Sequence, residues 1–237
     1  MLEIRDFSKT YKGGKRAVDH LTLTVNAGDI YGFISHNGAG KTTTLKAVSG
    51  ILDYEEGDIL VGGVSLKANP VAVKRRIAFV PDNPDLYEHL TGVQYLSFIA
   101  DVFEVSADDR EARISRYADL LTLTPALGDL VSSYSHGMKQ KLALIGALCH
   151  EPELMLLDEP FVGLDPKAAF TLKELMRGMC AAGCAILFST HVLDVAEKLC
   201  NKIAIIKNGR LIAFGLTDEV RGNKSLEAVF LELTDHE

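Results

Sequence analysis

Ser35-His36-Asn37-Gly38-Ala39-Gly40-Lys41-Thr42 is the stretch that decides the fold of this 237-residue chain. Residues 29–34, just before it, are mostly apolar and predict a short buried strand, and residues 43–48, just after it, predict a helix. A strand, a small-residue turn that ends in Gly-Lys-Thr and a helix together indicate a phosphate-binding loop. We therefore expect this stretch to bind a nucleoside triphosphate.

The chemistry of the loop depends on four of its residues. Gly38 and Gly40 let the backbone curl so that successive N–H groups point at one anion, and the helix that follows adds the positive end of its dipole. Lys41 can reach the outer phosphates, and the Thr42 hydroxyl can be a ligand of Mg²⁺. The alternative is a glycine-rich turn with a surface lysine, but it does not explain Gly-Lys-Thr directly between a strand and a helix.

The first position of the loop is Ser35, where such motifs normally have glycine. A positive φ at this position would cost a serine about 1 kcal/mol or more, whereas an ordinary φ would change little. The sequence leaves both possibilities open.

Composition and charge restrict the class of protein. The chain is 47% hydrophobic and 24% charged, as is ordinary for a soluble globular protein, and its length suits one α/β domain. A net charge of −7 argues against a non-specific nucleic-acid binder. Because the sequence has no charged-then-apolar leader and no run of about 18 apolar residues, we expect a cytoplasmic chain. The four cysteines have no paired C-x-x-C spacing, so buried thiols are expected rather than a metal site.

Strand patterns surround the loop. Residues 2–7 and 21–25 alternate apolar and polar, and residues 57–66 predict a hairpin that turns at Gly62-Gly63. These segments predict an antiparallel sheet that leads into a nucleotide-binding core. Tyr11 stands between the first two, either as an ordinary strand-edge aromatic or as a flat ring stacked on a base.

Ionisable residues stand at the ends of three predicted buried strands: Asp82 one residue beyond 77–80, Asp158 and Glu159 directly after 154–157, and His191 directly after 185–190. Ligands of open α/β sheets bind at such strand ends. Two adjacent acids would be costly to bury without a cation, so Asp158 is expected to hold Mg²⁺ and Glu159 to polarise an attacking water. Asp82 is either a ligand-facing carboxylate or part of an Asp-Asn turn, and His191 is either structural or catalytic.

The composition changes to helical patterns between residues 86 and 147. Helices are predicted near residues 94–103, 108–121 and 139–149, with Thr91, Ser106 and Ser135 as their N-caps. The large apolar side chains at the start of this region form either core or a groove for a partner helix. Ser135 and Gly137 are expected first as helix-capping residues and also as a second helix start able to hold phosphate oxygens.

A phosphate loop, a Ser-x-Gly helix start and an Asp-Glu strand end, in this order, resemble the ATP-binding cassette of ABC transporters over essentially the whole chain. The resemblance implies an α/β fold with a P-loop NTPase core and a mainly parallel sheet, an N-terminal antiparallel β subdomain and an inserted helical subdomain. It divides the single domain of residues 1–237 into a core of residues 1–83 and 150–237 and a helical part of residues 84–149.

The resemblance also implies a role for each matching residue. The ATP-binding positions are Tyr11, Ser35, His36, Asn37, Gly38, Ala39, Gly40, Lys41, Thr42, Thr43, Ser135, Gly137 and Asp165. The Mg²⁺ positions are Thr42, Asp82 and Asp158. The catalytic positions are Glu159, His191 and Lys41.

Three departures from the family pattern matter. Asp82 replaces a glutamine that touches Mg²⁺ and the attacking water, and its charge either tightens the metal or weakens coupling to a partner. His136 and Met138 replace neighbours of Ser135 and Gly137 in the signature, which is usually Leu-Ser-Gly-Gly-Gln. The stretch that continues through Lys139 and Gln140 is similar to the exporter-like (ABC-2 type) branch.

By this resemblance one chain holds half a site, and a second cassette, identical or different, supplies Ser135 and Gly137. We expect an ATPase that dimerises on ATP and drives export through an integral membrane subunit, lying on the inner face of the membrane through that partner. The alternatives are a soluble ABC ATPase with a non-transport role and a weakly hydrolysing regulatory cassette.

Overall fold

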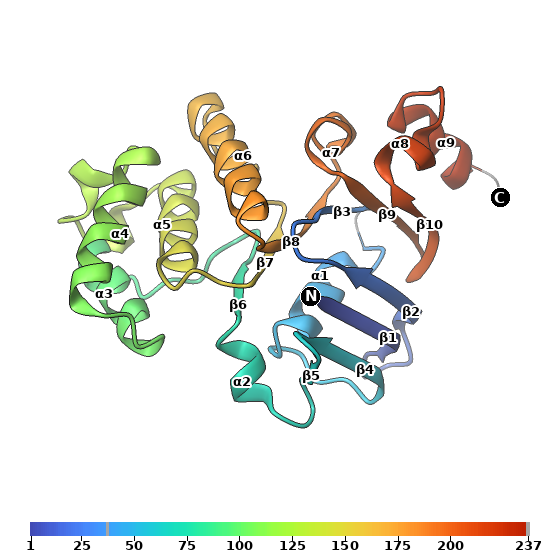
Figure 1. Cartoon of the computed structure of the whole chain (residues 1–237), viewed down its shortest axis with the longest axis horizontal. Coiled ribbons are helices and arrows are strands. Elements are labelled where there is room, and N and C mark those ends of the chain that lie inside the picture. Colours follow the sequence, from blue (N-terminus) through green and yellow to red (C-terminus); the bar gives the residue numbers. More distant parts are fainter. Residues whose placement is uncertain (37, 236–237) are drawn as a thin grey trace.

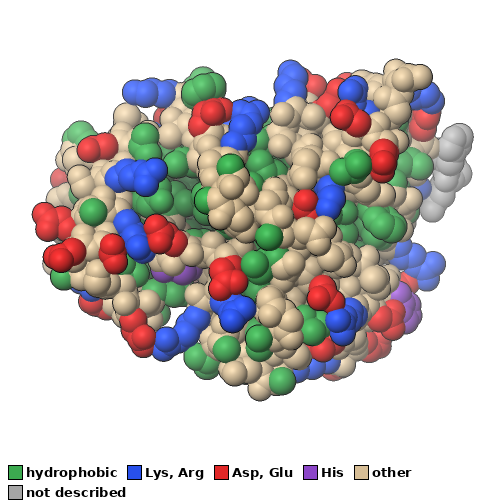
Figure 2. All heavy atoms as spheres, viewed as in Figure 1, with side chains coloured by type: hydrophobic (Ala, Val, Ile, Leu, Met, Phe, Trp, Pro, Cys, Tyr) green, Lys and Arg blue, Asp and Glu red, His purple; other side chains and the backbone are tan. Residues whose placement is uncertain are grey.

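The computed structural model describes residues 1–36 and 38–235, and two β-sheets organise it (Figure 1). Asn37, which the sequence places among the nucleotide-binding residues, lies outside the described part. Acidic and basic side chains are interspersed over the face in Figure 2, so this face carries charge of both signs. Among the described residues, no helix is long and apolar enough to span a membrane.

The smaller sheet is antiparallel and has the strand order β2-β1-β4-β5. Its strands are β1 (Leu2–Thr10), β2 (Arg16–Val25), β4 (Glu56–Val61) and β5 (Val64–Ser65). The alternation in the sequence is confirmed, because Leu2, Ile4, Leu21, Leu23 and Val25 are all buried. The predicted hairpin turn at Gly62-Gly63 is also confirmed, and both glycines have positive φ.

The larger sheet has the strand order β10-β9-β3-β8-β7-β6 and is parallel except for the pair β9-β10. Its strands are β3 (Ile30–Ile34), β6 (Ile77–Val80), β7 (Leu154–Asp158), β8 (Ala185–Thr190), β9 (Lys202–Lys207) and β10 (Arg210–Leu216). Every residue of β3, β7 and β8 is buried, as expected when helices or a second sheet cover both faces of a parallel sheet. The expected fold class is therefore confirmed.

Successive side chains of these central strands enter two different hydrophobic cores. Phe33 and Leu156 point into the core shared with the antiparallel sheet and with α1 (Lys41–Val48). Ile34 and Leu157 point into the opposite core, which is covered by helices. The helices that contribute to that core include α5 (His136–Cys149), α6 (Pro166–Ala181), α7 (Leu193–Leu199) and α9 (Leu226–Asp235).

The remaining helices are short or belong to the region between β6 and β7. They are α2 (Pro70–Lys74), α3 (Gly92–Val102), α4 (Ala107–Leu120), η1 (Thr124–Ala126), η2 (Val131–Ser133) and α8 (Thr217–Arg221). Figure 1 places α3, α4 and α5 together, to one side of the two sheets.

The predicted N-caps of α3, α4 and α5 are confirmed. Thr91 accepts a hydrogen bond from Gln94 N–H, Ser106 from Asp109 N–H and Ser135 from Met138 N–H. Thr91 also forms the reciprocal capping box, because the Gln94 side chain accepts from the Thr91 N–H. The division of the chain at residues 84–149 stays a prediction.

Candidate functional site

The turn between β3 and α1 depends on a glycine that no other residue can replace without strain. Gly40 caps α1 with φ of 111°, and a Cβ there would lie 2.5 Å from the carbonyl oxygen of Ala17 on β2. Ser35, in contrast, is buried and does not adopt a positive φ. The serine at the first position of the loop therefore carries no left-handed strain.

Lys41, the first residue of α1, is buried beneath this turn. Its Nζ donates to the carbonyl oxygen of Ser35 at 2.8 Å and to Ser35 Oγ at 3.0 Å, and it lies 3.9 Å from Glu159 Oε1. Burial lowers the pKa of the Lys41 ammonium, while the carboxylates of Glu159 and Asp158 act in the opposite direction. The Lys41 ammonium is thus paired with carbonyl oxygens of the loop and with the Glu159 carboxylate.

The acids at the end of β7 are fixed by a hydroxyl network. Asp158 Oδ2 accepts from Thr42 Oγ1 at 2.7 Å, and Asp158 Oδ1 accepts from Ser189 Oγ of β8. The same Ser189 oxygen accepts from the N–H of Glu159 at 2.9 Å. Glu159 has φ of 47°, an uncommon conformation for a residue with a side chain, and such outliers cluster at functional sites.

His191 follows β8 and lies beside the second acid. Its Nδ1 is 3.0 Å from Glu159 Oε2, so Glu159 stands between the Lys41 ammonium and the imidazole. The ends of β7 and β8 and the start of α1 therefore bring Lys41, Asp158, Glu159 and His191 together.

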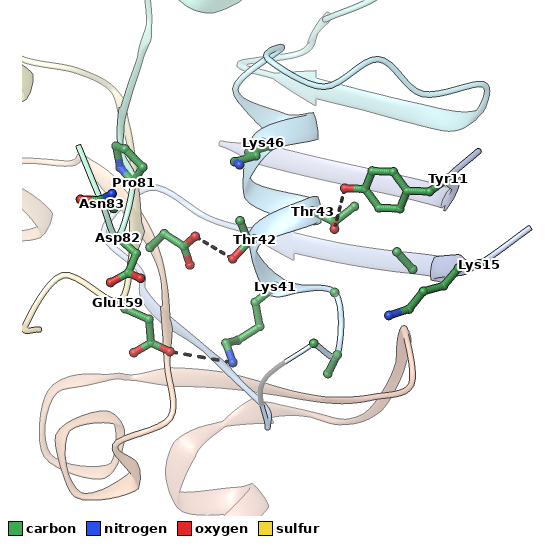
Figure 3. Close-up of a pocket in the computed structure, with 15 residues that line it drawn as sticks. Tyr11, Lys15, Lys41, Thr42, Thr43, Lys46, Pro81, Asp82, Asn83 and Glu159 are labelled. Carbon is green, nitrogen blue, oxygen red and sulfur yellow. Dashed lines mark hydrogen bonds and ion pairs between the residues drawn. The ribbon is translucent and has the colours of Figure 1, made fainter. Parts of the chain in front are cut away.

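A cavity of about 500 Å³ opens over the N-terminus of α1. Its lining consists of Tyr11, Lys15, Ala17, Gly38, Ala39, Gly40, Lys41, Thr42, Thr43, Lys46, Pro81, Asp82, Asn83, Asp158 and Glu159. In Figure 3, Asp82 and Glu159 lie on one side of the helix start and Tyr11 and Lys15 on the other. The Tyr11 hydroxyl is 3.2 Å from Thr43 Oγ1.

The signature residues lie outside this cavity. Ser135 caps α5, and at Gly137 a Cβ would approach the carbonyl oxygen of Gly163 to 2.5 Å. Asp165 caps α6 and accepts from Lys141 Nζ at 2.8 Å, a hydrogen bond that, with the Ala168 N–H, lowers the Asp165 pKa to about 2. Within one chain, then, these three positions do not join the loop.

The side chain of His36 also lies outside the cavity. Its ring packs against Phe230 of α9, with ring centroids 4.8 Å apart.

Several residues of the site were missed from the sequence. Ser189 is the only hydroxyl residue besides Thr190 in the otherwise apolar strand β8, and that exception was the available signal. The other missed positions are Lys15, Lys46 and Asn83 in the cavity and Lys141 beside Asp165. Because their partners are remote in sequence, no local pattern points to them.

A curled backbone at a helix start, a buried lysine and a hydroxyl-bound acid pair define a phosphate-loop nucleotide-binding protein. The comparisons are more specific. The sequence profile of the family described as "ABC transporter" matches residues 18–162. A solved structure described as the ATP-binding subunit of an ABC transporter has a TM-score of 0.94 and 36% identity, and the alignment covers 99% of both chains.

Two relatives are also named as ATP-binding proteins. An ABC transporter ATP-binding protein of Nostoc sp. (strain PCC 7120) is 38% identical, over 86% of this chain and 61% of its own length. The daunorubicin/doxorubicin resistance ATP-binding protein DrrA of Streptomyces peucetius is 34% identical, over 99% of this chain and 71% of its own length. This chain therefore spans less than two thirds of the Nostoc protein. It belongs to the ABC transporter family, as an ATP-binding cassette, which is the ATPase unit of that family.

Proposed function

We propose that this chain binds ATP–Mg²⁺, dimerises on it, hydrolyses it and drives export through a separate membrane subunit. The observation that carries the proposal is that Lys41, Thr42, Asp158 and Glu159 line one cavity over a helix start. Its volume of about 500 Å³ falls within the usual range of small-molecule sites, about 300–1,000 Å³.

ATP would be held along the length of this cavity. The backbone N–H groups near Gly38 and Gly40, with the N-terminus of α1, suit the phosphates. Lys41 would exchange its bonds to Ser35 for bonds to the outer phosphates, and Thr43 lies beside it at the helix start. Tyr11, which is 41% exposed, presents a ring at the far end for stacking on the adenine.

The residues of the cavity also fit Mg²⁺. Thr42, Asp158 and Asp82 offer only oxygen donors, the type that this ion prefers. In the described part of the chain, no cluster of three His, Cys, Asp or Glu side chains could hold a metal by itself. That agrees with an ion that takes one or two carboxylates and completes its shell with phosphates and water. Bound there, Mg²⁺ would neutralise charge on the outer phosphates.

Glu159 is the proposed general base for the attacking water. It is mostly buried, and its left-handed backbone directs the side chain toward Lys41 and His191. Lys41 and His191 would stabilise charge around the γ-phosphate from two sides. A positioned base of this kind contributes about 10²–10⁴ in rate.

The second half of the site would come from another copy or from a different cassette. Ser135 and Gly137 stand at the exposed N-terminus of α5, outside the cavity of their own chain. Such a helix start can donate N–H groups to phosphate oxygens. ATP would then act as a ligand shared across the dimer, shifting the equilibrium toward the closed state. Asp165, near the start of α6, would lie at the same seam.

A membrane subunit would contact the groove between β6 and the helices. This groove has a volume of about 590 Å³ and is lined mainly by apolar side chains, including Phe79, Tyr95 and Phe103. Exposed Tyr87 and Phe98 pack on each other nearby, with ring centroids 5.4 Å apart. Export is supported by the 34% identity to the drug-resistance protein. The chain would thus lie in the cytoplasm, on the inner face of the membrane through its partner.

Calorimetry with ATP tests the nucleotide site. Lys41→Ala removes a charged hydrogen-bond donor to phosphate and should lower the affinity for ATP roughly ten- to hundredfold. Lys198→Ala, at an exposed position on α7, is the control and should leave ATP binding unchanged. Equal affinity of Lys41→Ala and wild type would contradict the proposal. Phosphate release by the pure protein, with and without membrane partner, then separates an active cassette from a weakly hydrolysing regulatory one.

A further inference from the structure

Helix α9 is firmly attached to the body of the protein. The N–H of Leu226 donates to Glu197 Oε2 of α7 at 2.8 Å, and Ser225 accepts from the N–H of Ala228. Leu226 and Phe230 are buried in the helix-covered core. Figure 1 shows α9 beside α8, at the end of the sheet where β9 and β10 run. Because α9 is anchored in this way, it can stabilise the residues that pack against it.

One of its contacts is the phosphate loop. The Phe230 ring, 5% exposed, meets the His36 ring edge to face at a centroid distance of 4.8 Å and an interplanar angle of 60°. His36 lines a small cavity of about 180 Å³ on this side, together with Lys207, Asn208 and Thr234. The loop is thus sandwiched between the nucleotide cavity on one side and α9 on the other.

The turn between β9 and β10 supports the same side of the loop. The N–H of Gly209 donates to the carbonyl oxygen of Ala39 at 3.1 Å. Lys207 Nζ donates to the carbonyl oxygen of Thr234 at 3.0 Å, near the end of α9. Loop, turn and helix are therefore joined, although their sequences are far apart.

This support becomes important when Lys41 turns toward phosphate. In the structure, Lys41 Nζ holds the loop from inside, through Ser35 and, at 3.4 Å, through the carbonyl oxygen of His36. Those bonds are given up when the ammonium binds phosphate oxygens. The contacts that remain on His36 and Ala39 then include the outer ones, to Phe230 and Gly209, besides the bond from Ser35 Oγ to the His36 carbonyl oxygen.

We propose that Phe230 is a positioning residue of the phosphate loop: it holds His36 from α9 and so keeps the loop ordered for nucleotide. The inference rests on the proposed function only in taking ATP as the ligand. Aromatic edge contacts of this kind correspond to roughly two- to tenfold in a binding constant.

A double-mutant cycle in the full chain tests this. ATP affinity is measured by calorimetry for wild type, Phe230→Leu, His36→Ala and the double variant, with Leu231→Ala, at an exposed position of α9, as the matched control. Each single variant should weaken ATP roughly two- to tenfold, the double variant should be no weaker than either single one, and the control should bind as wild type does. Fully additive effects, or no effect of His36→Ala, would overturn the proposal.

Two further measurements distinguish the loss of a positioning contact from a general loss of folding. His36 is exposed on the loop, so His36→Ala should lower the melting temperature without nucleotide by only a few degrees and stay fully folded at the assay temperature, and its weaker binding cannot come from unfolding. Hydrogen exchange of the α9 amides should slow when wild type binds ATP, and unchanged exchange would count against the link. If wild type itself binds no ATP, the proposed function fails; if all variants bind as wild type does, only the positioning role fails.

Discussion

Thr42 Oγ1 lies 2.7 Å from Asp158 Oδ2, although the two residues are 116 positions apart in the chain. This bond ties the first turn of α1 to the end of β7, so the phosphate loop and the acid pair are held as one unit. Ser189 binds the other carboxylate oxygen and the Glu159 N–H. Lys41, Thr42, Asp158 and Glu159 thus reach the cavity from the start of α1 or from the end of β7.

Ser189→Ala tests the hydroxyl network. Without the hydroxyl, Asp158 loses one partner, and the N–H that supports the left-handed backbone at Glu159 is left unpaired. We expect the rate of phosphate release to fall roughly tenfold or more, since an unsatisfied buried group costs about 1–3 kcal/mol. ATP affinity measured without Mg²⁺ should stay unchanged, and Ser189→Thr, which keeps a hydroxyl, should retain more activity. A rate equal to that of wild type would show that the network is dispensable.

Replacement by alanine is expected to have opposite effects at two glycines, Gly40 and Gly178. Gly40→Ala places a Cβ against the Ala17 carbonyl oxygen at φ of 111°, so the loop must distort and ATP binding should be lost. Gly178 lies inside α6, where an added Cβ would meet no atom within 4 Å. Gly178→Ala should therefore stabilise the protein by about 0.5–1 kcal/mol. Calorimetry with ATP and urea unfolding check the pair. Retained ATP affinity in Gly40→Ala would contradict the strain argument.

The ion pair between Lys141 and Asp165 predicts how the stability of the protein depends on pH. In the folded chain, the bond from Lys141, together with the Ala168 N–H, lowers the Asp165 pKa from its ordinary 3.8 to about 2. The stabilisation is therefore complete above about pH 4 and is lost as pH falls through about 2. Lys141→Met should raise the Asp165 pKa toward 3.8, as measured by carboxyl NMR titration, and destabilise the chain at pH 7 but not near pH 2. An unmoved pKa would mean that the helix cap alone sets it.

The sequence predicted the strands, caps and loop of this fold well because each has a local cause. The fully apolar residues before Asp158 predict a strand buried on both faces, and the Ser or Thr residues before α3, α4 and α5 predict helix starts. The positive φ of the Asn208-Gly209 turn follows from the residue types themselves. For such features, a few neighbouring residues determine the conformation.

Other features depend on contacts that no local pattern contains. Nothing near Ser35 indicates that its φ is ordinary, since that depends on how Lys41 and the β3 strand pack around it. The choice of partner for Asp165 is set by the meeting of α5 and α6, and His36 turns to α9 because Phe230 is buried there. These relationships join residues 24 to roughly 200 positions apart, so only the folded chain reveals them.

The central claim is that two cassettes share each ATP, and for a pair of identical chains the mass of Glu159→Gln in saturating ATP–Mg²⁺ tests it most directly. This variant keeps the cavity but removes the general base, so ATP should persist and hold a dimer. The matched control adds Ser135→Asp, which can still cap α5 but presents a negative charge where the partner's γ-phosphate is expected. By sedimentation equilibrium, the account predicts a dimer for Glu159→Gln and a monomer, with ATP still bound, for the double variant. A monomeric Glu159→Gln with ATP bound would contradict the sharing of ATP between two copies of this chain.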